Sequence, residues 1–397
     1  MSARRIIVLV LMLTAAGSAA TAQTTDDLFE PTLHDLRLFM NSRDLQELRD
    51  TYLENTYYQA DLEWRGVRVR SVGIRSRGHA SRNPTKPSLR IDFNRYVSGQ
   101  RFLGLSSLML DNLWQDPAFV REGVTMALFT KLGQPAPREA YTRLFINDVY
   151  QGLYASIESI DSNFLARAFA DRAGYVFEYQ WQDEFRGQYL GESLAPYKLR
   201  FKAENHSLDP DATLYVPLHD LFQEVNRPES ATWRESVERY LDVPSFLTHV
   251  AIETYVSELD GILGYWAMNN LYVYRPSGST RHHFIPWDRD QSFQAPDSSV
   301  MLRVDDNVLL RRLLAHPDLR AYYLQMLETL AHISSEGGWM EQEIVTRANL
   351  IREAAHADGS KAYTNEEFEG TIAALQAFAA ARPGIVLAEV ATLRQAP

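Results

Sequence analysis

The sequence predicts an α+β protein with a strand-rich first half and a mostly helical second half, together forming two lobes. Two patterns carry this prediction. Polar and apolar residues alternate over residues 58–93, which is typical of β-strands, whereas apolar residues recur at helical spacing in residues 245–259, 308–333 and 340–355. No internal repeat or low-complexity linker divides the 397 residues, so one compact unit is expected.

The first 22 residues have the pattern of an export signal. Arg4 and Arg5 precede the apolar run Ile6–Leu13, and a small-residue stretch ends with A-T-A at residues 20–22. The apolar run is much shorter than the roughly 20 residues that a transmembrane helix needs. We therefore expect a cleaved signal peptide at residues 1–22, a mature chain starting near Gln23, and export to the periplasm or the extracellular space. A short membrane anchor is the alternative reading, and no later segment is expected to span a bilayer.

Composition restricts the ligands of the mature chain. Without Arg4 and Arg5 it carries 38 basic (40 − 2) and 51 acidic side chains, a formal charge of −13 (38 − 51). Such a surface repels nucleic acid and anionic membranes, so a polyphosphate ligand would need a locally basic pocket. The absence of cysteine excludes disulfides, thiolate metal sites and a cysteine nucleophile.

Two helices are expected in the first half. Residues 44–55 form the first, because Asp44 and Glu47 are spaced for a capping box. The pair Asp116-Pro117 predicts the start of the second, which ends near Leu132 before Gly133. The alternating segments predict strands at residues 60–64, 67–74, 88–93, 141–146 and 152–158, with a turn at residues 147–148 before the last of them.

Beyond about Phe164 the chain is expected to be helical, except for one strand pair. Residues 270–274 and 283–287 form this hairpin around a Pro-Ser-Gly turn at residues 276–278. The expected division is residues 23–163 for the strand-rich lobe and residues 164–397 for the helical lobe. A ligand is expected in the cleft between the two lobes.

Acidic and amide side chains gather around this hairpin. Asp260 ends a helix, Asn269 and Asn270 enter the first strand, and Asp288 and Asp290 follow the second. Oxygen ligands of these types suit Mg²⁺, which leaves room for substrate phosphates. Each residue also has an ordinary reading, as a turn residue, a strand-end cap or a partner of a neighbouring amide.

Their order in the chain also indicates a chemistry. Asp260 precedes Asp288 by 28 positions (288 − 260) and could accept the proton of an attacking hydroxyl. A base, then an amide ligand, then an acidic ligand is the order found in protein kinases. The match is incomplete, since H-R-D is absent and the interval from base to asparagine is longer here.

The first half of the chain is expected to supply the residues that bind the phosphates of a nucleotide. Lys86 is the only lysine of the strand-rich part before the helix at residue 116, and a carboxylate such as Glu122 could hold it against an α- or β-phosphate. The alternative is a solvated lysine that protects a sheet edge. Arg75 and Arg77 alternate onto one strand face before Gly78, where they could bind phosphate or pair with carboxylates.

Several separated blocks resemble the spore-coat protein H (CotH) kinase family. They occur in the family's order and extend over nearly the whole mature chain. The matching blocks are the arginine–glycine turn at residues 73–81, the lysine strand at 86–93, the helix start at 116–122, the strand-to-hinge segment at 147–161, the N-N-L-Y-V-Y block at 269–274, the P-W-D-R-D block at 286–290 and the segment at 310–317.

The resemblance implies an atypical, secreted-type protein kinase fold with a strand-rich nucleotide-binding lobe and a mostly helical catalytic lobe. It implies phosphorylation of serine or threonine on a partner protein, with ATP and Mg²⁺ as cofactors and Mn²⁺ as an alternative metal. The base falls on Asp260. The metal falls on Asp288 with Asn270 or Asn269, and Asp290 is a further metal candidate. The resemblance places the nucleotide lysine on Lys86, and Glu122, Arg77 and Glu158 are further candidates for nucleotide binding.

Other functions find less support in the sequence. His282 and His283 could bind a transition metal, but no third ligand lies at metal-site spacing, so a strand-start pair is the preferred interpretation. No G-x-S-x-G, H-E-x-x-H or Walker loop is present. The remaining alternative is a kinase-shaped binding or adhesion protein of the cell envelope without turnover.

Overall fold

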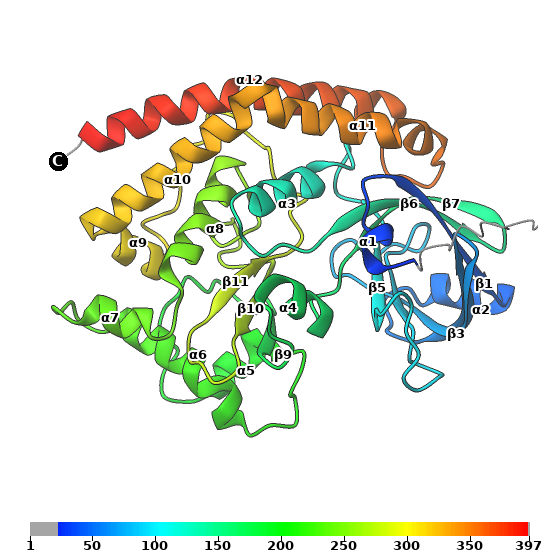
Figure 1. Ribbon diagram of the computed structural model, residues 1–397, viewed down its shortest axis with the longest axis horizontal. Helices are drawn as coiled ribbons and strands as arrows, with labels where there is room; N and C mark the ends of the chain where they lie inside the picture. Colours follow the sequence, from blue (N-terminus) through cyan, green and yellow to red (C-terminus); the bar gives the residue numbers. More distant parts are fainter. Residues whose placement is uncertain (1–22, 396–397) are drawn as a thin grey trace, which may run out of the picture.

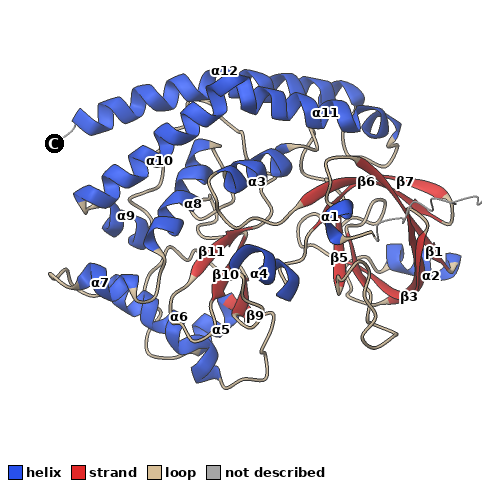
Figure 2. Ribbon diagram, viewed as in Figure 1, coloured by secondary structure: helices blue, strands red, loops and turns tan. Residues whose placement is uncertain are grey.

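The computed structural model describes residues 23–395 as an α+β protein. A strand-built barrel occupies the N-terminal part, and helices surround a small sheet in the rest of the chain (Figures 1 and 2). The α+β class predicted from sequence is therefore confirmed. The expected signal peptide lies outside the described residues.

The first part is a closed barrel in the order β1-β2-β3-β4-β5-β7-β6. Neighbouring strands are antiparallel, except that β1 runs parallel to β6 and closes the barrel. Its interior is an apolar core that includes Leu36, Leu38, Leu62 and Ile91. The strands are β1 (Leu33–Met40), β2 (Tyr58–Trp64), β3 (Val67–Ser76), β4 (Leu89–Asp92), β5 (Ser107–Asp111), β6 (Glu139–Ile146) and β7 (Val149–Ile157), and the helices beside them are α1 (Thr25–Leu28), α2 (Ser42–Asp50) and α3 (Arg121–Lys131).

Five of these strands match the predicted ones, while β1 and β5 were not predicted. Every residue of β5 except its last is buried, so it has no period-two alternation. The reason is its position, because Leu108 and Leu110 face the barrel core and Met109 faces the core of the helical part. The predicted turn at Asn147 and Asp148 is confirmed, and both residues have positive φ, as a two-residue hairpin requires.

Both helix starts predicted in this half are wrong. Helix α2 begins at Ser42 because Asn41 caps it, its side chain accepting the N–H of Arg43 at 2.8 Å. Helix α3 begins at Arg121 rather than at Asp116. The Asp116 carboxylate accepts the N–H groups of Ala118 and Arg121, at 2.9 and 2.8 Å, and so shapes the segment before the helix.

The second part contains a four-stranded sheet in the order β11-β10-β8-β9, surrounded by helices. The predicted hairpin is confirmed as β10 and β11, but it is half of a larger sheet. The strands are β8 (Tyr175–Tyr179), β9 (Phe201–Ala203), β10 (Leu271–Arg275) and β11 (His283–Pro286), and the helices are α4 (Ser162–Phe169), α5 (Ala195–Arg200), α6 (Asp211–Asn226), α7 (Trp233–Glu238), α8 (Val243–Tyr255), α9 (Val308–Leu314), α10 (Pro317–Ser335), a 3₁₀ turn (Glu336–Gly338), α11 (Trp339–Ala357) and α12 (Asn365–Gln395).

The helix expected over residues 308–333 is in fact two helices, α9 and α10. His316 has extended backbone angles and Pro317 occupies the first turn of α10, so the chain changes direction between them. Helix α12, which was not predicted, runs beside α10 and α11 along one side of the molecule (Figure 1).

Helix α12 bears on the expectation that no later segment spans a bilayer. Within residues 23–395 it is the helix that is long and apolar enough, by length and composition, to cross a bilayer. Its apolar face packs into the core through residues such as Phe368 and Phe378. Arg382, fully buried at its middle, donates 2.7 Å hydrogen bonds to the carbonyls of Thr254 and Tyr255. These contacts are those of a core helix.

Candidate active site

A buried ion pair between Glu253 and Arg289 stabilises the loop that carries Asp260. Glu253, in the last turn of α8, binds Arg289 through Oε1 at 2.6 Å and accepts the N–H of Ile262 through Oε2 at 2.8 Å. A side chain at Gly261 would lie 2.6 Å from the Glu253 carboxylate, so only glycine fits there. The loop after α8 and the loop after β11 are therefore joined beneath the site.

The Asp260 carboxylate is held by both candidate amides. Asn269 donates from Nδ2 to Oδ1 at 2.9 Å, and Asn270 donates from Nδ2 to Oδ2 at 2.8 Å. Burial raises the pKa of Asp260, and the bonds from the two asparagines oppose the rise. The predicted base and both predicted amides thus meet in one cluster, and neither amide oxygen accepts a hydrogen bond from another described residue.

Four carboxylates from three segments influence one another electrostatically, and Asp260 adds to the negative charge at Asp288. Asp111 ends β5, Glu122 lies in the first turn of α3, and Asp288 and Asp290 follow β11. Burial raises the pKa of Asp288 to about 6, with Asp111 adding to the rise and Arg77 opposing it. Burial also raises the pKa of Asp290 and Glu122 well above their usual values, and the neighbouring carboxylates add to both shifts.

This cluster fits a hard cation that also binds substrate oxygens. Mutual repulsion among the carboxylates would be relieved by positive charge, and Asp111, Asp288 and Asp290 remain partly exposed, as ligand access requires. In the described part of the chain, no three His, Asp or Glu side chains are arranged to hold a metal alone.

Lys86 lies in a different environment from the one predicted. Its Nζ binds Oδ2 of Asp358 at 2.6 Å, and both side chains are fully buried. The Lys86 ammonium also faces the rings of Phe119 and Tyr154, at 5.2 and 5.1 Å from their centroids. Burial lowers the pKa of Lys86, while Asp358 opposes this. The expected ion pair with Glu122 is not formed here, because Glu122 faces the acidic cluster instead.

Arg77 reaches the edge of that cluster. Its Nη1 lies 3.4 Å from Oδ2 of Asp111, and its guanidinium lies 5.8 Å from the centroid of the Trp287 ring. Arg75 instead binds Asn55 at 2.8 Å. Of the two arginines, only Arg77 contacts a residue of the cluster.

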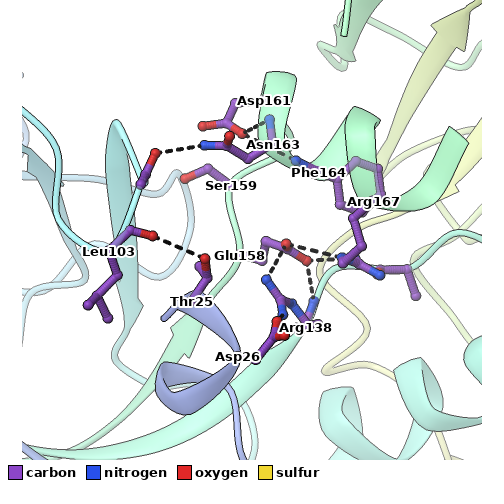
Figure 3. Close-up of polar contacts among 12 residues, drawn as sticks. Thr25, Asp26, Leu103, Arg138, Glu158, Ser159, Asp161, Asn163, Phe164 and Arg167 are labelled. Carbon is purple, nitrogen blue, oxygen red and sulfur yellow. Dashed lines mark hydrogen bonds and ion pairs between the residues drawn. The ribbon is translucent and has the colours of Figure 1, made fainter. Parts of the chain in front are cut away.

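Glu158 is buried and paired with two arginines. Its Oε1 accepts from Arg138 at 2.9 Å and its Oε2 accepts from Arg167 at 2.6 Å. Figure 3 shows both arginines converging on this carboxylate, with Asp26 bound to the far side of Arg138. The network joins α1, the residue that follows β7, and α4. Both oxygens of Glu158 are therefore paired in this structure, and its predicted role in cofactor binding stays a prediction.

The histidine pair is not a metal site in this structure. His282 is fully buried, its Nδ1 lies 2.8 Å from the carbonyl oxygen of Tyr240, and burial lowers its pKa to about 3. It is a neutral core residue. His283 lies in β11 and contacts Asp242 at 3.6 Å, which agrees with the strand-start interpretation.

Sequence reasoning missed three residues of the site. Asp111 had a usable signal, because it follows the apolar run at residues 107–110 as an acid at the end of a buried strand. Glu258 had none; its carboxylate binds the Asp260 N–H at 2.8 Å and the Ser292 hydroxyl at 2.6 Å. Asp358 had none either, because it lies 272 residues from Lys86 in the chain.

Comparison with known proteins gives the class of this chain and then its family. A family model described as CotH kinase protein matches residues 74–386, so the class is kinase-like. The chain is also similar to inner spore coat protein H of Bacillus subtilis (strain 168), with 24% identity over 344 residues that cover 84% of this chain and 91% of that protein. The chain belongs to the CotH kinase protein family.

Proposed function

We propose that this protein is an exported kinase that transfers the γ-phosphoryl group of Mg–ATP to serine or threonine hydroxyls of a partner protein or of itself. Residues 23–163 would form the nucleotide-binding lobe and residues 164–397 the catalytic lobe, in a two-lobed kinase-like arrangement. The observation that carries the proposal is the Asp260 carboxylate, fixed by Asn269 and Asn270 beside Asp288 and Asp290.

Asp260 is the proposed general base. Two amide donors fix its orientation, and its raised pKa brings its basicity closer to neutral pH. In the transfer, the acceptor hydroxyl oxygen forms a bond to the γ-phosphorus while the bond from that phosphorus to the β–γ bridging oxygen breaks. The hydroxyl proton passes to Asp260, and ADP carries away the electron pair of the broken bond.

Asp288 and Asp290 are the proposed metal ligands, with the free amide oxygen of Asn270 as a third. Bound Mg²⁺ would neutralise charge on the phosphate oxygens, and Mn²⁺ could replace it. Lys86 and Arg77 are the proposed phosphate contacts from the barrel. Arg77 is suited to this because it already meets the edge of the acidic cluster at Asp111.

The test is transfer of labelled phosphate from ATP by the purified protein, with casein as a serine-bearing acceptor and with Mg²⁺ or Mn²⁺. Labelling of casein or of the protein itself is expected. A protein whose melting temperature rises with Mg–ATP but which never transfers phosphate would support the binding-protein alternative instead. Export has a separate test, because N-terminal sequencing from the native host should find a chain starting near Gln23.

A further inference from the structure

One side chain of the connection between α11 and α12, that of Asp358, contacts buried residues of the barrel. Asp358 follows the last residue of α11, and its carboxylate is fully buried. Its Oδ2 accepts from Lys86 Nζ at 2.6 Å and from the N–H of Leu153 at 3.0 Å, while its Oδ1 accepts from the N–H of Ser360 at 2.9 Å. Three donors from three segments therefore fix this carboxylate.

The barrel is shaped to receive Asp358. Gly152 in β7 has a φ of +126°, and a side chain there would lie 2.6 Å from the Asp358 carboxylate oxygens. The neighbouring Tyr150 hydroxyl donates to the carbonyl of Ala354 at 2.9 Å, which attaches the end of α11 to the same strand. Figure 1 shows α11 and α12 lying along one side of the helical part, and α11 contacts β7. The close approach thus depends on a glycine at position 152.

Lys86 is paired with this carboxylate and is also influenced by one member of the acidic cluster. Asp358 holds it directly, and the negative charge of Asp111 also acts on it. Phe119 and Tyr154 face the ammonium and exclude water. A lysine buried this deeply stays charged only while a carboxylate is paired with it. Glu122 does not serve that role here, because its neighbours are Glu139, Asp288, Asp111 and Asp290.

We propose that Asp358 is the positioning residue for the nucleotide lysine Lys86, so that the α11–α12 connection takes the place of the α3 glutamate in holding that lysine. The proposal rests on the proposed function, because it requires Lys86 to contact the nucleotide. In this arrangement the C-terminal helices complete the nucleotide site. Displacement of the connection removes the counter-charge of Lys86 and weakens its grip on phosphate.

The experiment compares Asp358→Asn and Gly152→Ala with wild type. Calorimetry measures Mg–ADP affinity, and steady-state transfer to casein gives kcat and the KM for ATP and for casein. Both variants should lose roughly 10-fold or more in nucleotide affinity, as expected when the group that orients a ligand-binding residue is removed. The KM for casein should not change. If the Lys86–Asp358 pair were only structural, both variants would lose stability, but the KM for ATP would not change relative to the KM for casein.

Asp35→Asn is the matched control. It removes one carboxylate from a half-exposed barrel ion pair with Arg143, at 2.6 Å, and should leave nucleotide affinity at the wild-type value. Wild-type affinity in either folded test variant overturns the proposal. A wild type that binds Mg–ADP without transferring phosphate contradicts the proposed function, yet the affinities still test Asp358. A wild type that binds no nucleotide overturns both.

Asp358→Asn leaves an unpaired buried lysine and can fail to fold. In that case Lys86→Met is compared with the double variant Lys86→Met/Asp358→Leu, which replaces both charges with apolar groups. If Asp358 acts through Lys86, the two have equal nucleotide affinity. A further loss of affinity in the double variant shows an independent role for Asp358 and overturns the proposal.

Discussion

Asn270 donates a 2.8 Å hydrogen bond from its side-chain amide to Oδ2 of Asp260. Asn269 makes the matching bond to Oδ1, so the carboxylate has no freedom to rotate. Asn270 has a positive φ and directly precedes β10, which ties the orientation of the carboxylate to the start of that strand. The loop after α8 and the strand β10 therefore act as one unit.

Asp260→Asn should separate catalysis from binding. The amide keeps the size of the side chain but cannot accept a proton, so kcat should fall by roughly 10²–10⁴-fold. The Mg–ATP thermal shift should stay close to that of wild type, because Asp260 acts after nucleotide has bound. Label transfer to casein and a thermal-shift titration measure the two effects. Turnover at the wild-type rate would remove Asp260 from the mechanism.

The two asparagines should differ in their effect on metal dependence. If Asn270 is the metal ligand, Asn270→Ala raises the Mg²⁺ concentration needed for half-maximal activity by about 10-fold or more, as loss of a ligand or its partner does. Asn269→Ala then lowers kcat without changing that concentration, because it only loosens Asp260. A magnesium titration of both variants makes the comparison, and the reverse result would move the ligand to Asn269.

Asp288→Asn should abolish transfer without damaging the fold. Loss of the charge that holds the metal against phosphate should lower kcat by roughly 10²–10³-fold. The melting temperature without metal should stay the same or rise, because the substitution removes repulsion with Asp111 and Asp260. Asp290→Asn is the informative comparison. If that variant alone is inactive at saturating metal, the ligand is Asp290.

The effect of Mg²⁺ on stability should grow with pH. The folded pKa of Asp288 is raised to about 6 and that of Glu258 to about 7, chiefly by burial. The folded protein therefore holds more protons than the unfolded chain between about pH 4 and pH 7, and stability without metal falls as pH rises through this range. A cation binds the ionised carboxylates, so the stabilisation of the folded protein by Mg²⁺ increases as pH rises.

Differential scanning calorimetry with and without Mg²⁺ checks this dependence. The metal-induced rise in melting temperature should be larger at about pH 8 than at about pH 5. Asp288→Asn supplies the control, since it lacks the titrating group and should show a smaller difference between the two pH values. An equal effect of Mg²⁺ at both pH values in wild type would argue against a metal site at these carboxylates.

The sequence predicted the parts of this protein that local patterns encode. The hairpin β10–β11 and the groups at its ends follow from alternation and from turn residues, and the structure brings Asp260, Asn269 and Asn270 into contact. Strand β5 was missed because burial on both faces removes alternation. Helix α2 was misplaced because Asn41, rather than Asp44, makes the cap.

The pairing of distant charges was not predictable from the sequence. Lys86 could be recognised as unusual, but its partner depends on where the α11–α12 connection meets β7, which is a property of tertiary packing. Glu158 is a second residue whose charged partners could not be predicted from the sequence. It was predicted as a cofactor-binding candidate, and its pairing with Arg138 and Arg167 could not be predicted, because those side chains come together only after the chain has folded.

Glu158→Gln should lower stability and spare nucleotide binding. The carboxylate is buried and pairs with two arginines that keep part of their exposure. The amide can still accept one of those bonds but removes the buried charge that both arginines share, at a cost of about 1–3 kcal/mol in the free energy of unfolding. Urea denaturation measures that loss. The KM for ATP should stay within about twofold of wild type, because Glu158 has no oxygen free for the cofactor. Glu204→Gln, which weakens an exposed pair with Lys202 at 2.6 Å, should change neither quantity appreciably.

If Glu158→Gln kept full stability but bound ATP poorly, the carboxylate would belong to the nucleotide site after all, and the ion pairs with Arg138 and Arg167 would have to open when nucleotide binds.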